Sequence, residues 1–297
     1  MENFKSGFIA IVGRPNAGKS TILNRMVGAK IAITTAKPQT TRDQILGILN
    51  REDYQMVFVD TPGVHRPKTR LGDYMNHAAI GAIGSVDAAL LMADATRGFG
   101  EPEKRIIEEL EKKQIPAVLG LNKIDCMTKE ALLPQIAAYS EAFPFAAIVP
   151  LSAKTGDGAE ILLSELEKFL IPGPMYYPDD MITDKTEREI MAEFIREKLL
   201  SYLDQEIPHG TAVEIMEMKD EKKVCRILAD IVCEKASHKS IIIGRGGAML
   251  KRVGTAAREE AEVFFGKKIF LQLFVKVKDD WRNSGSMLRT LGFSDKE

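Results

Sequence analysis

Apolar and amphipathic stretches alternate over about residues 5–170 of the chain. Short apolar runs, each followed by polar or turn-forming residues, are typical of strands buried in a sheet. These runs are Phe8–Val12, Met56–Val59, Ala117–Leu121 and Ile148–Leu151. The stretches Glu101–Gln114 and Ile161–Leu170 instead repeat apolar residues at a helical spacing. This alternation predicts a doubly wound α/β domain with a mostly parallel sheet.

A different order of elements follows a stretch rich in proline and acidic residues. That stretch, residues 172–185, predicts a semi-rigid linker. The apolar face of the next helix fits core packing, with binding to a membrane surface as the alternative. We therefore expect a first domain over residues 1–171 and an α+β domain over residues 186–297. The elements expected in the second domain are a helix at Thr186–Leu203, strands at Ala212–Met216 and Val224–Cys233, a helix reaching about Phe265 and a strand at Ile269–Val277.

A phosphate-binding sequence follows the first apolar run and leads into a helix. It matches the pattern GxxxxGKS, in which glycines let the backbone N–H groups surround a phosphate at a helix N-terminus. Lys19 would reach the β- and γ-phosphates, and the Ser20 hydroxyl would ligate Mg²⁺. The alternative, a glycine-rich turn, explains neither the preceding strand nor the following helix. The candidate residues are Gly13, Arg14, Pro15, Asn16, Ala17, Gly18, Lys19, Ser20 and Thr21.

The second nucleotide-binding sequence is DxxG, which comes directly after the apolar run at Met56–Val59. The carboxylate of Asp60 can hold the hydration shell of Mg²⁺, and the Gly63 N–H can contact the γ-phosphate. Alone this motif is usually a turn, but its place after a phosphate-binding loop favours function. Its candidate residues are Asp60, Thr61, Pro62, Gly63 and Val64.

Two further sequences predict selection of guanine. In the pattern NKxD, the Asp125 carboxylate can accept hydrogen bonds from both the ring N–H and the exocyclic amine of guanine. Adenine would leave that carboxylate unpaired. In the later sequence SAK, the N–H of Ala153 would meet the guanine carbonyl. The candidate residues are Asn122, Lys123, Ile124, Asp125, Ser152, Ala153 and Lys154.

A polar segment between the phosphate-binding loop and DxxG predicts a switch. Within residues 37–42, Thr41 is our choice for the hydroxyl that closes on Mg²⁺ when the γ-phosphate is present, with Thr40 second. An ordinary solvated loop is the alternative. The five nucleotide-binding elements follow the order found in translation-factor-class GTPases.

Two positions bear on the rate of hydrolysis. Val64 replaces the glutamine with which Ras-like enzymes orient the attacking water, so we expect slow turnover, of order 10⁻⁴ to 10⁻² s⁻¹. His65 could assist the water, or be an ordinary surface histidine. Asn16 resembles a ligand for K⁺, which would supply positive charge in place of an arginine finger; alternatively it only shapes the loop. The residues assigned to catalysis are Lys19, Thr41, Gly63 and Asn16.

The C-terminal part contains an RNA-binding signature. A GxxG sequence at residues 244–247, between an isoleucine run and an amphipathic helix, is typical of KH domains, which clamp about four nucleotides of single-stranded RNA. The segment from Lys235 to Lys278 has ten Lys or Arg and three acids, although the whole chain has a net charge of -1. Phe274 and Trp281 fit the core or a hinge better than base stacking. The RNA-binding candidates are Lys239, Ile243, Gly244, Arg245, Gly246, Gly247, Lys251 and Arg252.

Composition adds a prediction of compartment. The three cysteines, Cys126, Cys225 and Cys233, form no CxxC and fit free thiols in a reducing cytoplasm; a disulfide or a metal-binding pair formed by the last two is the alternative. We expect no signal peptide, because the first apolar run is short and leads into the phosphate-binding loop. No apolar run approaches the roughly 18 residues that span a bilayer.

Over essentially its whole length the chain resembles the Era family of GTPases. The matching sequences are GRPNAGKST, TTRD, DTPG, NKID and SAK, then PDDMITD at residues 178–184, IIIGRGG and VKVKDDW at residues 275–281. The resemblance implies a P-loop GTPase domain and a type II KH domain, with GTP or GDP and Mg²⁺ as cofactors. It also implies binding of the 3′ end of 16S rRNA and action in 16S rRNA processing and 30S subunit biogenesis.

Further expectations come with the resemblance. It implies that nucleotide exchange needs no dedicated factor and that the protein associates peripherally with the cytoplasmic face of the cell membrane. We also expect that GTP gates RNA binding, and the sequence leaves open a link to cell-cycle control. We expect a cytoplasmic monomer that binds no DNA. The rival hypotheses are an RNA chaperone with a purely structural nucleotide domain and a tRNA-modification GTPase. Enzymes of the second kind carry additional catalytic domains in place of a KH domain, whereas the C-terminal part here is short and resembles a KH domain.

Overall fold

The structure is a computed structural model that describes residues 4–35, 37, 40–63 and 69–293. The chain forms two units, each with its own core. The first comprises residues 1–32, 41–67 and 75–184. The second comprises residues 33–40, 68–74 and 185–297, so that two short segments from the N-terminal half of the chain belong to it.

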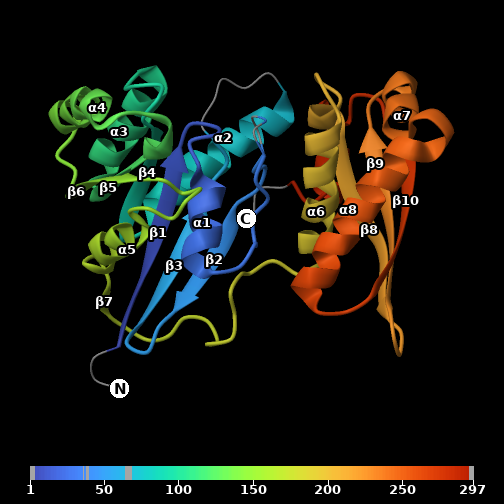
Figure 1. The fold of residues 1–297 in the computed structure, drawn as a ribbon, viewed down its shortest axis with the longest axis horizontal. Helices are drawn as coiled ribbons and strands as arrows, with labels where there is room; N and C mark the ends of the chain where they lie inside the picture. Colours follow the sequence, from blue (N-terminus) through green and yellow to red (C-terminus); the bar gives the residue numbers. More distant parts are fainter. Residues whose placement is uncertain (1–3, 36, 38–39, 64–68, 294–297) are drawn as a thin grey trace. The chain divides into compact units, whose positions relative to one another are not determined.

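A mostly parallel sheet forms the centre of the first unit (Figure 1). Its strands run in the order β2-β3-β1-β4-β5-β6; β2 is antiparallel to β3, and the short β7 is antiparallel to β1. This is the predicted doubly wound α/β fold, in which ligands bind beyond the carboxyl ends of the strands. The strands are β1 (Lys5–Gly13), β2 (Ile45–Asn50), β3 (Tyr54–Asp60), β4 (Ala88–Asp94), β5 (Ala117–Asn122), β6 (Ala147–Leu151) and β7 (Ile171–Pro172).

Helices cover both faces of this sheet, because its central strands are apolar on both sides. In β1, Ile9 and Ile11 pack into a core that includes α1 and α5, whereas Ala10 and Val12 pack into a core that includes α3. All four side chains are fully buried. The helices are α1 (Lys19–Val27), α2 (Arg70–Ala82), α3 (Glu101–Lys113), α4 (Lys129–Ala142) and α5 (Ala159–Glu167), with 3₁₀ turns at Ile83–Ser85 and Ile124–Cys126.

The second unit is a three-stranded sheet with helices packed on one face. Its strands run in the order β10-β9-β8, with β9 parallel to β10 and antiparallel to β8. Helices α6 and α8 pack on each other and on the sheet, and the apolar face of α6 contributes Ile190 and Phe194 to the core. The elements are α6 (Glu187–Tyr202), β8 (Thr211–Asp220), β9 (Cys225–Cys233), α7 (Ala236–Ile243), α8 (Ala248–Phe265), β10 (Ile269–Val277) and α9 (Gly285–Thr290), with 3₁₀ turns at Pro208–Gly210, Arg245–Gly247 and Trp281–Asn283.

The three cysteines of the described residues carry free thiols. Cys225 and Cys233 are buried in β9, and burial raises the pKa of the Cys225 thiol to about 11. In the described part of the chain, no helix has the length and apolar character needed to cross a membrane.

Candidate nucleotide site and RNA groove

The loop between β1 and α1 is shaped by residues with left-handed backbone. Gly18 has φ 101°, and a Cβ there would overlap the amide of Asn122. Asn16 also has a positive φ, of 64°, a conformation that asparagine tolerates better than most residues. The Arg14 side chain pairs with the carboxylate of Glu103 in α3, so that Arg14 can serve a phosphate only through its backbone.

Lys19 and Thr21 lie in the first turn of α1, and the Lys19 side chain folds back over this loop. Its amine donates to the carbonyl oxygens of Gly13 at 3.1 Å and Arg14 at 3.0 Å. Burial lowers the pKa of Lys19 to about 8, although the nearby charge of Asp60 opposes this shift. Phosphate oxygens would favour the charged form of this buried amine.

Three oxygen-bearing side chains converge next to Lys19. The Ser20 hydroxyl lies 2.9 Å from the Thr41 hydroxyl and donates to Asp60 Oδ2 at 2.8 Å. Burial raises the pKa of Asp60 to about 6, and the charge of Lys19 opposes the rise. The other oxygen, Oδ1, is buried without a hydrogen-bond partner among the described residues. Hard oxygen donors with one unsatisfied carboxylate oxygen fit Mg²⁺, which Ser20, Thr41 and Asp60 would hold.

The threonines of the switch segment differ in what they contact. The Thr40 hydroxyl donates to the Lys37 carbonyl at 2.7 Å within its own loop, whereas the Thr41 hydroxyl faces Ser20. The geometry therefore favours Thr41 as the Mg²⁺ ligand. Val64 and His65 lie outside the described residues.

The DxxG segment is held against the phosphate-binding loop. The Thr61 hydroxyl donates to the Ile11 carbonyl at 2.9 Å, and Pro62 is buried. Gly63 approaches Pro15 so closely that a Cβ would lie 2.6 Å from the Pro15 nitrogen. This contact places the backbone of Gly63 beside the loop that would surround the phosphates.

Asn122 ties the remaining elements together. Its amide nitrogen donates to the Ala17 carbonyl at 2.7 Å, and its Oδ1 accepts from the N–H groups of Ala153 at 2.9 Å and Lys123 at 2.8 Å. The phosphate-binding loop, NKxD and SAK therefore meet at one buried side chain. The chain then continues past Lys123 into the 3₁₀ turn Ile124–Cys126.

Asp125 lies at the rim of this arrangement, where a base could reach it. A hydrogen bond with Ser152 holds the pKa of the exposed Asp125 carboxyl below its usual range. A cavity of about 510 Å³, lined in part by Asp125, Ser152 and Asp157, adjoins the carboxylate. The charged acceptor that guanine selection needs is therefore available at neutral pH.

Sequence reasoning missed two side chains that support the base site. Asp94, at the end of β4, accepts from the Lys123 amine at 2.7 Å; burial alone would raise the pKa of Asp94, but hydrogen bonds from Lys123 and Thr96 bring it below its usual value. Arg25 of α1 donates to the carbonyls of Ala153 at 2.9 Å and Lys154 at 2.8 Å. An acid at a strand end was the only available signal for Asp94.

The GxxG loop of the second unit joins α7 to α8. Gly244, Gly246 and Gly247 all have positive φ, of 73°, 60° and 81°. A Cβ at Gly246 or Gly247 would meet nothing within 4 Å, whereas one at Gly244 would lie 2.8 Å from Met249 Cβ. Gly244 is thus needed for packing, and the next two glycines leave the loop open to a close ligand. Arg245 is exposed on the loop.

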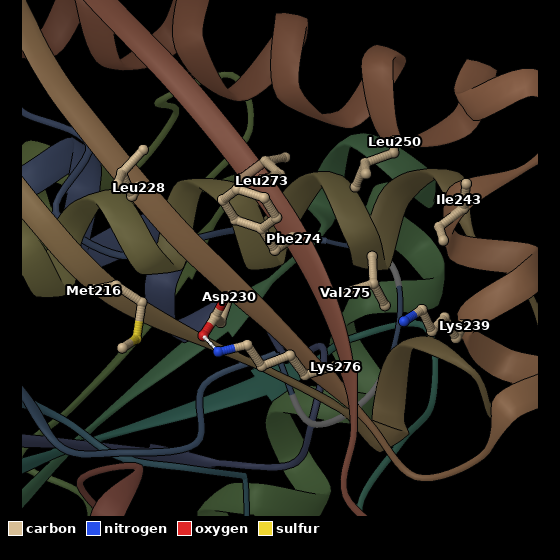
Figure 2. A pocket seen from close by; sticks show the side chains of 10 residues that line it. All are labelled: Met216, Leu228, Asp230, Lys239, Ile243, Leu250, Leu273, Phe274, Val275 and Lys276. Carbon is tan, nitrogen blue, oxygen red and sulfur yellow. Dashed lines mark ion pairs between the residues drawn. The ribbon is translucent and has the colours of Figure 1, made fainter.

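A cavity of about 630 Å³ lies beside edge strand β10 (Figure 2). Of the predicted RNA-binding residues, Lys239 and Ile243 line it; Lys251 is exposed on α8, and the Arg252 guanidinium instead stacks over the Tyr202 ring at 4.1 Å. The expectation that Phe274 belongs to the core is wrong, because its side chain lines the cavity and is 46% exposed. An apolar strand does not reveal which of its faces is covered. Trp281, in contrast, is fully buried and donates to the Gly210 carbonyl at 2.9 Å.

Fold and site together define a P-loop GTPase joined to a KH domain. A family described as 50S ribosome-binding GTPase matches residues 8–123, and the KH domain family matches residues 206–282. The chain is 50% identical over 290 residues to GTPase Era of Clostridium acetobutylicum, covering 98% of both chains.

Two solved Era structures are similar over the whole chain. One, an Aquifex aeolicus variant bound to GDP and AlF₄⁻, has a TM-score of 0.94 and 36% identity, covering 98% of this chain and all of the other. The second, in complex with MgGDPNP and nucleotides 1506–1542 of 16S ribosomal RNA, has a TM-score of 0.95 and 36% identity, covering 98% and 99%. The chain belongs to the Era family of GTPases, as its sequence motifs predicted.

Proposed function

We propose that this GTPase binds the 3′ end of 16S rRNA in the groove of its KH domain and acts in 16S rRNA processing and 30S subunit biogenesis. The observation that carries the proposal is the open GxxG loop next to a cavity with basic side chains, since a KH domain clamps RNA through such a loop. The similar Era structure with a 16S rRNA fragment supports the choice of RNA. The GTP-site residues would hold GTP or GDP with Mg²⁺.

Replacing Gly246 and Gly247 together with aspartate should weaken binding of this RNA by at least roughly 100-fold, because two carboxylates would face phosphates at close range. The effect is measured by fluorescence anisotropy of a short labelled RNA with the sequence of the 3′ end of 16S rRNA. A scrambled RNA of the same composition is the comparison. The matched control replaces both glycines with asparagine, which has the same shape and tolerates positive φ without the charge. Unchanged binding by the aspartate variant would contradict the proposed RNA path.

We further propose that GTP gates RNA binding through the segment at residues 33–40, which belongs to the second unit. Within that unit, Ile33 is part of the core, the Thr34 N–H donates to Glu197 at 3.0 Å, and Arg196 donates to the Thr40 carbonyl. Arg196 and Glu197 of α6 are each only 3% exposed, so solvent has little access to these two contacts. One peptide bond separates Thr40 from Thr41, the expected Mg²⁺ ligand. A movement of Thr41 toward the metal would therefore be transmitted to α6 through the contacts of Thr34 and Thr40.

The Arg196→Met variant should bind RNA with equal affinity in the presence of GDP and of a non-hydrolysable GTP analogue. Coupling between two sites is typically worth about 1–3 kcal/mol, so the wild-type ratio of affinities should be roughly 5 to 150. Arg188→Met on the same helix, whose guanidinium donates to the Ile215 carbonyl, is the control and should keep the wild-type ratio. A wild-type ratio in Arg196→Met would show that this contact does not transmit the signal.

We also propose that Asn16 ligates K⁺ beside the bridge between the β- and γ-phosphates. Its left-handed backbone keeps the residue at the bend of the loop. Intrinsic turnover, of order 10⁻⁴ to 10⁻² s⁻¹, should be at least about 10-fold faster in KCl than in NaCl, and Asn16→Ala should remove the difference. Phosphate release from the purified protein measures both rates; equal rates in the two salts would leave Asn16 with a role in loop shape alone.

Other expectations stay predictions. They are a cytoplasmic monomer that binds no DNA, peripheral association with the cytoplasmic face of the membrane, and a link to cell-cycle control. Light scattering of the purified protein and its flotation with anionic vesicles test the first two. The rival function, an RNA chaperone with a structural nucleotide domain, would be favoured if RNA affinity were independent of nucleotide. The predicted boundaries at residues 171/172 and 185/186 await limited proteolysis.

A further inference from the structure

One face of the KH sheet carries no packed helix among the described residues. Along β9 and β10 the side chains alternate, with Ile227, Ile231 and Val275 directed into the core. The opposite face presents Phe270 and Phe274, which are 48% and 46% exposed. An exposed aromatic ring is a surface on which a base can stack. The Arg226 guanidinium already lies over the Phe270 ring, 5.2 Å from its centroid, so Phe274 is the ring considered for stacking.

The cavity beside β10 connects this open face to the groove proposed for RNA. On the helix side it is lined by Lys239, Ile243 and Leu250, close to the GxxG loop. On the sheet side it is lined by Phe274, Asp230 and Lys276 (Figure 2). Phe270 is not among the residues that line it. A strand of RNA in the groove can therefore continue past the edge of the sheet.

Asp230 is an unusual residue for a site that meets RNA. It faces Phe274 in the strand register, is 3% exposed and pairs with the Lys276 amine at 2.5 Å. A buried carboxylate repels phosphate and is tolerated only while it is paired. The Lys276 side chain is 52% exposed and can turn toward a phosphate, which would leave Asp230 in need of a donor.

The chemistry of a carboxylate restricts what that donor can be. An ionised carboxylate only accepts hydrogen bonds. Cytosine, adenine and guanine each carry an exocyclic amine, whereas uracil presents a carbonyl oxygen where cytosine has its amine. A contact at that position would thus favour cytosine over uracil, because Asp230 attracts the amine of cytosine and repels the O4 carbonyl of uracil.

We infer that Phe274, Asp230 and Lys276 form a nucleobase subsite that extends the RNA groove and selects a base with an exocyclic amine. The base stacks on Phe274, its amine donates to Asp230, and Lys276 moves to the adjacent phosphate. The inference rests on the proposed RNA-binding function and adds to it a base preference and a position.

Oligocytidylate and oligouridylate of equal length provide the test, because they carry the same charge and differ in the group that Asp230 would read. Anisotropy at fixed salt should show that wild type binds the cytidylate about 10-fold more tightly. Asp230→Asn should bring that ratio to within about twofold while the thermal midpoint confirms folding. Any base preference from other residues of the groove is the same in wild type and in Asp230→Asn. The difference between their cytidylate-to-uridylate affinity ratios therefore reports on Asp230.

A pair of matched substitutions tests the stacking surface. Phe274→Leu should weaken binding of both oligonucleotides by roughly 10-fold, whereas Phe270→Leu, on the same strand and face, should change it by less than about twofold. Equal affinity of wild type for both RNAs, an unchanged ratio in Asp230→Asn, or equal effects of the two leucine variants would each overturn the subsite and leave the RNA-binding proposal standing. If the protein bound neither oligonucleotide and did not bind the 3′ end of 16S rRNA, both the subsite and the RNA-binding proposal would be overturned.

Discussion

Replacing Lys19 with methionine lowers the rate of GTP hydrolysis by roughly 10²- to 10³-fold at saturating GTP. The Lys19 amine is buried beside the phosphate-binding loop, where a positive charge acts on developing negative charge with little screening by water. Methionine preserves the length and packing of the side chain and removes the charge. Phosphate release under single-turnover conditions measures the loss. Lys168→Met, at an exposed ion pair with Glu165, should keep the wild-type rate.

The same residue predicts a pH dependence of GTP affinity. In the protein without nucleotide the pKa of Lys19 is lowered to about 8, and bound phosphate raises it again. Binding then takes up a proton above about pH 8, so affinity is greatest below that pH and falls as the pH rises through it. Lys19→Met should lack this slope. Hydrolysis by Lys19→Met within about threefold of wild type, or an identical slope in both proteins, would contradict the role assigned to Lys19.

Changing Asp125 to asparagine should cost roughly 10²- to 10⁴-fold in affinity for GDP. The carboxylate accepts two hydrogen bonds from guanine, and bonds to a charged group are worth about 1.5–3 kcal/mol each. The amide introduced by this substitution would present a donor to the exocyclic amine of guanine, which is itself a donor. Xanthine carries an oxygen at that position, so the variant should gain affinity for XDP.

Asp157→Asn is the matched control for this exchange. Asp157 lines the same cavity as Asp125 but lies outside the NKxD sequence. Titration with fluorescent GDP and XDP should show wild-type preference in Asp157→Asn and reversed preference in Asp125→Asn. If Asp125→Asn retained its GDP affinity within about threefold, recognition of guanine would have to come from another residue.

The strands that carry the candidate nucleotide motifs could be predicted from the sequence, because each is a short apolar run that ends at a motif. Strands β1, β3, β5 and β6 end at these motifs, and their carboxyl ends meet at one edge of the sheet. The hydrophobic pattern did not predict β4, whose sequence AALLMAD favours a helix by propensity. Its burial between β1 and β5 makes it a strand, and Asp94 at its end was missed for that reason.

Side-chain environments were harder to predict than strands. Arg196 and Glu197 lie in a charged helix and would be expected on a solvated face, but both are buried, and they hydrogen-bond to Thr40 and Thr34 of the same unit. Phe274 shows the opposite error. It shares the open face of β10 with the polar residues Gln272 and Lys276, whereas the apolar residues Leu273 and Val275 on the other face pack into the core. Contacts between segments distant in sequence decide both cases.

The central claim, a GTP-gated RNA-binding switch, is tested most directly with the wild-type protein. The affinity for a labelled RNA ending like the 3′ end of 16S rRNA would be measured by anisotropy at fixed salt, with GDP and with a non-hydrolysable GTP analogue. The account predicts binding roughly 5 to 150 times tighter with the analogue. Equal affinities with the two nucleotides would contradict it, because the KH domain would then act independently of the GTPase domain.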